Sequence, residues 1–140
     1  MSEAGLPFLE LRAGASLAAI RPLSELLGVA LRALGADAAA QHDLSLAVAE
    51  LVSNLQQHEY GGGEGEVGVR LVKEAAALRL EVRSGGPAFD LQGALAQAAA
   101  SPEGFQGHGL GLPLLVGLFD SIACHQEAGQ NCFVLRKLDA

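Results

Sequence analysis

The amino-acid sequence predicts an α+β fold: a two-layer α/β sandwich, with a mostly antiparallel mixed sheet of about five strands and three main helices on one face. Three observations lead to this prediction. Long stretches repeat apolar residues at the helical period, shorter segments alternate apolar and polar residues, and most of these strands follow one another as hairpins. Hairpin connections argue against a doubly wound parallel sheet. A chain of 140 residues without internal repeats fits one domain, 1–140.

The composition narrows the class of protein further. Half of the residues are hydrophobic and 18% are charged, which excludes a disordered chain. A net charge of -7 without any Lys/Arg run argues against nucleic-acid binding and favours a protein partner. No apolar stretch is long enough to span a membrane, and the N-terminus has no basic region ahead of an apolar core. We therefore expect a cytoplasmic location, with no membrane or nucleic-acid partner.

The two cysteines, Cys124 and Cys132, lie near the C-terminus without a metal-ligand pattern around them. They fall on facing strands of a predicted hairpin, and their spacing leaves a disulfide open.

The N-terminal part of the chain predicts an edge strand at 7–12 and then a helical stretch at 17–34, with Ser16 as its N-cap. Pro22 interrupts this stretch. We interpret it as the first residue of a second helical segment, because the leucines after it then form one clean stripe. That stripe ends at Gly35, a suitable C-cap.

Asp37 caps the next predicted helix, which ends near Tyr60. Its apolar residues recur at the spacing of one buried stripe: Leu44, Ala47, Val48, Leu51, Val52 and Leu55. Glu50, Asn54 and His58 lie four residues apart and form a separate polar row along the edge of this stripe. For this row alone, a solvated polar face is the simpler interpretation.

Apolar alternation at 67–71 and 78–82 predicts a hairpin whose second strand leaves the sheet at Ser84-Gly85-Gly86-Pro87. Downstream we expect, in chain order, an Ala-rich and weakly anchored helical segment at 90–100, a loop at 101–106, a third apolar helix at 110–119, and a closing hairpin formed by 121–127 and 131–137.

A glycine loop precedes the third helix, with glycines at alternate positions in Gly107-His108-Gly109-Leu110-Gly111-Leu112. Glycine allows backbone N–H groups to approach an anion, and the positive end of a helix adds to the attraction. The loop does not match the dinucleotide fingerprint, because a loop and not a strand precedes it.

Three sequence boxes in order carry a resemblance: E-L-V-S-N followed by H-E-Y, then S-G-G-P-A-F-D, then G-H-G-L-G-L. This pattern resembles the ATPase fold shared by histidine kinases, DNA gyrase and MutL. Within that fold, the chain is most similar to the bacterial anti-sigma-factor serine/threonine kinases. The resemblance spans roughly residues 7–138.

The resemblance implies ATP and Mg²⁺ as cofactors. Asn54 would hold Mg²⁺, for which an amide oxygen is a suitable hard ligand, and Glu50 would accept the proton of the attacking serine hydroxyl. The glycine loop (Gly107, His108, Gly109, Leu110, Gly111 and Leu112) would wrap the phosphates, with 90–106 as a lid. His58 and Tyr60 also match the family pattern, although packing or capping explains them equally well.

The adenine box departs from the family pattern D-x-G-x-G. Ser84 replaces the Asp that accepts a hydrogen bond from the adenine amino group, Gly86 is retained, and Ala88 replaces the second glycine. Loss of a charged acceptor costs about 1.5–3 kcal/mol, or roughly ten- to a hundredfold in affinity. A positive φ at Ala88 would add about 1–2 kcal/mol. A smaller departure is Gln130-Asn131, where a threonine is expected near the closing hairpin. Since a hydroxyl both donates and accepts, we expect Ser84 to discriminate adenine poorly from guanine.

Two functions of different class follow. The first is an anti-sigma regulatory factor that binds a sigma factor and phosphorylates an anti-anti-sigma (STAS-type) partner. The alternative is a non-catalytic protein-binding module on the same fold with weakened nucleotide binding. A third interpretation, the ATPase half of a split sensor kinase, is weaker because the sequence shows no phosphoacceptor-histidine helix. The Ala- and Leu-rich first helix could support a homodimer or belong to the core.

Overall fold

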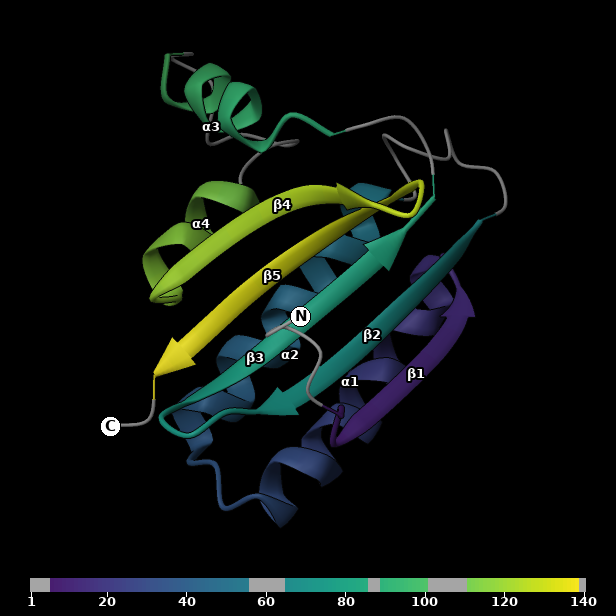
Figure 1. Ribbon diagram of the computed structural model, residues 1–140, viewed down its shortest axis with the longest axis vertical. Coiled ribbons are helices and arrows are strands. Elements are labelled where there is room, and N and C mark those ends of the chain that lie inside the picture. Colours follow the sequence, from purple (N-terminus) through teal and green to yellow (C-terminus); the bar gives the residue numbers. More distant parts are fainter. Residues whose placement is uncertain (1–5, 56–64, 86–88, 101–110, 139–140) are drawn as a thin grey trace.

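The computed structural model describes residues 6–55, 65–85, 89–100 and 111–138 (Figure 1). It contains a five-stranded sheet in the order β1-β2-β3-β5-β4. The elements are β1 (Leu9–Gly14), α1 (Leu17–Ala33), α2 (Ala38–Asn54), β2 (Glu66–Lys73), β3 (Ala77–Ser84), α3 (Leu91–Ala100), α4 (Gly111–Leu118), β4 (Ser121–Glu127) and β5 (Gln130–Leu138).

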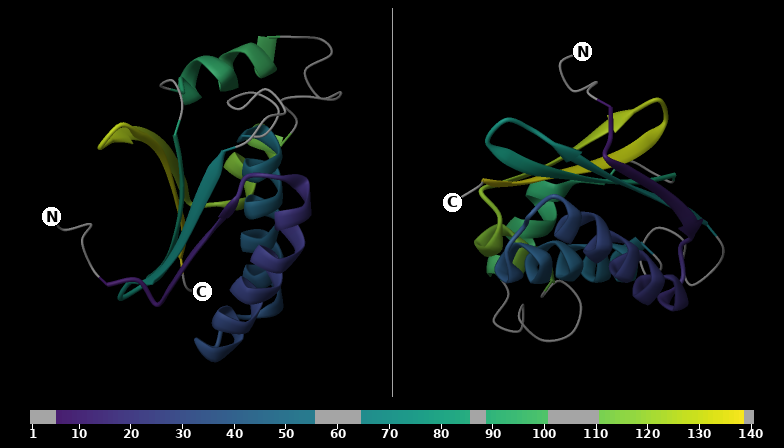
Figure 2. Two further views of the ribbon diagram at one scale, coloured as in Figure 1. Left: turned by 90° about the vertical axis from the view of Figure 1, so that its right-hand side faces the viewer. Right: turned by 90° about the horizontal axis from the view of Figure 1, so that it is seen from below.

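The helices α1, α2 and α4 pack on one face of the sheet, as Figure 2 shows. The predicted α+β sandwich with three main helices on one face is therefore confirmed. Every strand pair of this sheet is antiparallel, so the sheet is not mixed within the described residues. The predicted hairpins are also present: the one expected from 67–71 and 78–82 is formed by β2 and β3, and the one expected from 121–127 and 131–137 by β4 and β5.

The alternation of the strands explains which face is buried. In β2, Val67, Val69 and Leu71 face the helices, and the register aligns Val69 with Val82 of β3. The same face continues into β5 through Phe133, which lies opposite Val82. These side chains meet the apolar stripes of α1 and α2 in one core. Because side chains alternate in a strand, the intervening residues lie on the opposite, outer face.

One prediction about α1 is wrong: the helix runs unbroken through Pro22. Proline removes the hydrogen bond to the carbonyl four residues earlier, that of Ala18. Both residues are exposed, so water can hydrate that carbonyl, while Leu23 and Leu27 are buried in the core and hold the helix in place. Ser16 lies at the N-cap as predicted, but its side chain makes no cap hydrogen bond.

The junction between α1 and α2 follows the sequence closely. Gly35 has φ +80° just past the end of α1, and the Ala36 N–H donates to the Leu31 carbonyl (2.9 Å), as in a Schellman motif. Asp37 then caps α2, because its Oδ1 accepts a hydrogen bond from the Ala40 N–H at 2.9 Å. These contacts turn the chain sharply and set α1 and α2 side by side.

The outer face of the sheet carries a chain of ion pairs that we call the ionic ladder: Arg70, Arg79, Glu81, Glu74 and Arg136. Arg79 and Glu81 are almost fully buried and pair at 2.9 Å. Arg70 reaches Glu81 at 3.2 Å, and Glu74 pairs with both Arg79 and Arg136. Burial alone would raise the pKa of Glu74, but hydrogen bonds from Arg136 and Arg79 outweigh it and lower that pKa.

The two cysteines lie on opposite faces of the sheet. Cys124 faces Phe133 across the β4–β5 pair, on the core side, whereas Cys132 faces His125 on the outer side. Both are free thiols. A disulfide between them would need one strand to turn over, so the pairing left open by the sequence does not form in this fold.

No helix in the described part of the chain is long and apolar enough to cross a membrane.

Candidate functional site

The structure describes five of the predicted site residues: Glu50, Asn54, Ser84, Gly111 and Leu112. The others lie outside the described residues, namely His58, Gly86, Ala88, Gly107, His108, Gly109 and Leu110.

Glu50 and Asn54 lie one turn apart on the last two turns of α2, and both are half-buried. The stripe beside them is buried almost completely, from Leu44 to Leu55, and fixes the rotation of the helix. The two polar side chains are therefore held at the edge of the core, where a ligand can still reach them. Among the described residues, none forms a hydrogen bond or ion pair with the Glu50 carboxylate.

Ser84 ends β3 on the core face, and only 1% of it is exposed. It is aligned with Val67 on one side and with Asn131 of β5 on the other. Asn131 is fully buried, and its Oδ1 accepts two hydrogen bonds, from the Phe89 N–H at 2.9 Å and from Gln126 Nε2 at 2.7 Å. A buried amide therefore links β5 to the segment that leaves β3.

The Phe-Asp pair of the S-G-G-P-A-F-D box shapes the start of α3. The Phe89 ring lies 5.4 Å from the Phe133 ring, at a tilt of 50°. Asp90 Oδ1 accepts a hydrogen bond from the Gly93 N–H at 3.0 Å, as an N-cap does. A Cβ at position 93 would lie 2.2 Å from Asp90 Oδ2, so glycine is needed there for this cap. Both residues of the pair thus have structural partners.

The sequence marked Asn131 only as part of Gln130-Asn131, a departure from an expected threonine, and did not predict its buried hydrogen bonds. The available signal was its position in β5, where it precedes Phe133 and Leu135 at alternate residues. A polar residue at the inward-facing position of such a strand must find partners inside the protein. Which partners it finds depends on the β3–β5 register, since Phe89 lies 42 residues away.

The helix α4 begins at Gly111, and the Leu112 side chain is buried in the core with Leu115 and Phe119. Leu112 was predicted to bind the cofactor as the last residue of the glycine loop, and this stays a prediction. Because its side chain anchors α4, its backbone N–H is the group it can offer to a ligand at the start of the helix.

Figures 1 and 2 show the last turn of α2 and the end of β3 at the same end of the molecule. This arrangement brings the Glu50–Asn54 row and Ser84 to one end of the sandwich, with α2 on the core face of the sheet. The predicted metal and adenine positions therefore belong to one region.

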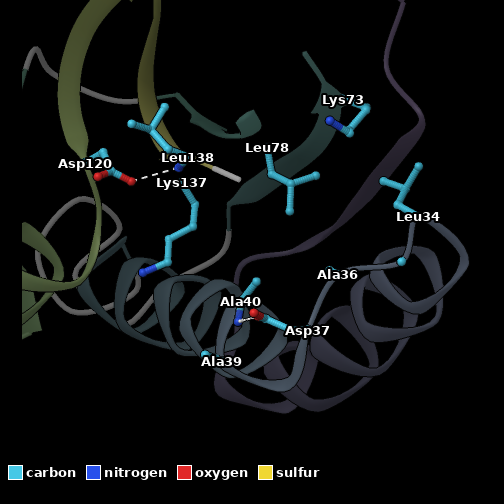
Figure 3. A pocket seen from close by; sticks show the side chains of 11 residues that line it. Leu34, Ala36, Asp37, Ala39, Ala40, Lys73, Leu78, Asp120, Lys137 and Leu138 are labelled. Carbon is cyan, nitrogen blue, oxygen red and sulfur yellow. Dashed lines mark hydrogen bonds between the residues drawn. The ribbon is translucent and has the colours of Figure 1, made fainter. Parts of the chain in front are cut away.

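A cavity of about 680 Å³ lies at the other end, where the α1–α2 junction meets the β2–β3 turn and the end of β5 (Figure 3). Its charged groups already have partners. Lys137 Nζ lies 2.8 Å from Asp43 Oδ2, Lys73 Nζ donates to a backbone carbonyl at 2.7 Å, and Asp120 Oδ2 accepts from the Leu138 N–H at 2.7 Å. Asp43 neutralises Lys137, and Asp37 and Asp120 on the lining offset the charge of Lys73, so this cavity is poorly suited to a triphosphate.

The sandwich, with a polar helix row and a buried strand end at one end of it, defines an ATPase domain of the histidine-kinase type. Residues 13–137 match the family model of the histidine kinase-like ATPase domain, and the chain belongs to this family. Membership in a family of ATPase domains implies ATP as the ligand.

Among solved structures, the chain is similar to the catalytic domain of histidine kinase ThkA in a nucleotide-free form. The TM-score is 0.58 at 17% identity, and the match covers 92% of this chain and 96% of that one. At this identity the likeness establishes the fold. No curated protein matches the chain.

Proposed function

We propose that this chain is an anti-sigma regulatory factor that binds ATP with Mg²⁺ and phosphorylates a serine or threonine of an anti-anti-sigma partner of the STAS type. The observation that carries this proposal is the Glu50–Asn54 row. A carboxylate and an amide lie one turn apart at the end of α2, half-buried beside a fully buried stripe. Family membership supports ATP as the phosphoryl donor, and the E-L-V-S-N box favours transfer to a hydroxyl.

The residues at this site fit the proposed cofactors. Asn54 offers an amide oxygen, a hard donor of the kind that Mg²⁺ binds while keeping several waters. Bound there with ATP, the ion would neutralise the phosphate charge. Glu50 would take the proton from the partner's hydroxyl as its oxygen bonds to the γ-phosphorus and ADP leaves. At the adenine end, Ser84 supplies a neutral hydroxyl, with the buried Asn131 amide aligned beside it.

The decisive variant is Glu50→Gln, assayed with the full chain, millimolar ATP and Mg²⁺, and a purified STAS-domain protein. Loss of the proton acceptor is expected to slow phosphate transfer by roughly 10²–10⁴-fold while the two proteins still form a complex. The matched control is Glu25→Gln, because Glu25 is an exposed glutamate on α1 that pairs only with Arg21 among the described residues. Wild-type transfer by the Glu50 variant would refute the assignment.

The alternative function, a protein-binding module with weakened nucleotide binding, is favoured by one observation. Ser84 stands where an acidic residue would accept the adenine amino hydrogen, and it is almost fully buried. Ser84→Asp is then expected to raise ATP affinity by roughly ten- to a hundredfold. If the unmutated protein binds its partner but transfers no phosphate at millimolar ATP and Mg²⁺, the module replaces the kinase as the proposed function.

The hydroxyl at Ser84 also bears on nucleotide choice. It can accept from the adenine amino group or donate to the guanine carbonyl, so calorimetry should find ATP and GTP bound with similar affinity. A preference for ATP above about a hundredfold would contradict this role for Ser84.

A homodimer through α1 is a further proposal. Leu23 and Leu27 are core residues, but Leu17, Leu26 and Val29 are about half exposed on the same helix. Light scattering of the wild type and of a Leu26→Ser variant tests whether these side chains hold two copies together; a monomeric wild type would refute it.

A further inference from the structure

The β4–β5 hairpin brings three different metal-ligating side chains together on the outer face of the sheet. His125 and Glu127 lie at alternate positions of β4, and Cys132 of β5 lies directly opposite His125. Their ligand nitrogen, oxygen and sulfur atoms all lie within 4.8 Å of one another. His125 Nε2 is 3.6 Å from Glu127 Oε1. The sequence showed no such pattern, because the third residue comes from the neighbouring strand.

We propose that His125, Glu127 and Cys132 bind a Zn²⁺ ion, with a water molecule completing a tetrahedral site. Imidazole nitrogen, carboxylate oxygen and thiolate sulfur are the three ligand types that zinc takes in proteins. Zinc–ligand bonds of about 2.0–2.3 Å place tetrahedral ligands roughly 3.3–3.8 Å apart. The distance of 3.6 Å between His125 Nε2 and Glu127 Oε1 already lies in this range. Cys132 Sγ lies within 4.8 Å of both ligand atoms and would have to move closer by about 1 Å to bind the same ion. This proposal is independent of the proposed nucleotide chemistry.

The strands hold the three residues in place while leaving a route for the ion. Cys132 is 1% exposed, whereas the side chains of His125 and Glu127 are about half exposed. The ion would therefore enter from solvent and contact the buried sulfur from above the hairpin. The backbone pairing of β4 with β5 fixes the spacing of all three side chains, which lowers the entropic cost of assembling the site.

Charged neighbours on β2 and β3 act on the proposed zinc ligands. Arg83 Nη2 pairs with Glu127 Oε1 at 2.9 Å and so holds the carboxylate beside His125, whose Nε2 lies 3.6 Å from the same oxygen. Glu81 and Arg70 also act on Cys132 electrostatically. A thiolate and a carboxylate together carry two negative charges, which Zn²⁺ neutralises.

Burial raises the pKa of the Cys132 thiol to about 11, although Arg83 opposes this. At neutral pH the metal-free thiol keeps its proton, so zinc binding breaks the S–H bond, forms the S–Zn bond and releases one proton to solvent.

The test is a titration of the reduced full chain with Zn²⁺ alone, read by competition with a chromophoric chelator. We expect one equivalent of zinc per chain, and Co²⁺ in its place should give the absorption bands of a tetrahedral thiolate complex. His125→Gln and Cys132→Ser are each expected to weaken binding by at least about tenfold. Cys124→Ser, on the opposite face, and His42→Gln, on the exposed side of α2, are the matched controls.

The proposal is overturned if the chain binds no zinc at micromolar concentrations, if His125→Gln binds it as tightly as the wild type, or if only the control variants lose it. Because His125 is half exposed, its replacement should leave the fold intact, as circular dichroism can verify. His125→Gln therefore decides the matter even if Cys132→Ser fails to fold.

Discussion

Replacing Asn131 with alanine is expected to lower the free energy of unfolding by about 1–3 kcal/mol, and the structure shows where this loss arises. The Asn131 side chain is fully buried and accepts two hydrogen bonds, one from the Phe89 backbone N–H and one from Gln126. Gln126 is exposed, so its amide can return to water at little cost. The Phe89 N–H lies at a partly buried position, and it would lose its acceptor.

An unsatisfied buried donor costs about 1–3 kcal/mol, more than the net value of the hydrogen bond itself. The matched control is Gln126→Ala, which removes the exposed donor and leaves the Phe89–Asn131 bond in place. That change should stay within about 0.5 kcal/mol, as is usual for surface substitutions.

Urea unfolding followed by far-UV circular dichroism suits this measurement, because the chain has no tryptophan. Hydrogen exchange at the Phe89 amide should speed up in Asn131→Ala and not in Gln126→Ala. If the two variants unfold at the same urea concentration with equal slopes, Asn131 does not hold the exit from β3, and the reasoning fails.

Three further changes test other parts of the fold. Asp37→Ala should cost about 0.5–2 kcal/mol in urea unfolding because it removes the α2 cap, whereas Ser16→Ala should cost little, since Ser16 makes no cap bond; equal losses would contradict the cap assignment. Ala128 has φ +54° in the two-residue β4–β5 turn, a conformation that asparagine adopts more readily than alanine. Ala128→Asn should therefore stabilise the fold by about 0.5–1 kcal/mol and raise the melting temperature; a lower melting temperature would argue against strain there. Glu74 has a lowered pKa in the folded state, so its contribution to stability is present above pH 4.5, its ordinary pKa, and is lost as pH falls through the folded-state pKa. Thermal melts from pH 7 to pH 3 should therefore fall less steeply for Glu74→Gln than for the wild type; parallel curves would rule out this linkage.

The fold was predictable because its signals are local. The alternation around Val69 and the helical stripe through Leu51 give the element type, and Gly35 and Asp37 mark the helix ends. Pro22 misled the prediction, because the burial of Leu23 and Leu27 in the core outweighs the cost of a proline inside the helix, and that burial depends on packing.

The site was predictable only in part. Glu50 and Asn54 fall in one row because residues four apart share a helix face whatever the fold. Asn131 and Cys132 acquire their partners through strand register, which joins residues far apart or on different strands. A shift of one residue would exchange their faces, and periodicity alone does not fix which face each one takes.

The ionic ladder has a consequence for how the sheet assembles. If β3 paired one residue out of register, Arg79 and Glu81 would face α1 and α2, and Leu80 would face solvent. Glu81 would then lose its ion pair with Arg70 of β2, and burying such charges among leucines without their cross-strand partners costs several kcal/mol. The ionic ladder thus specifies the register of β3. It disfavours pairings shifted by one residue, even where its net contribution to the stability of the correct fold is small.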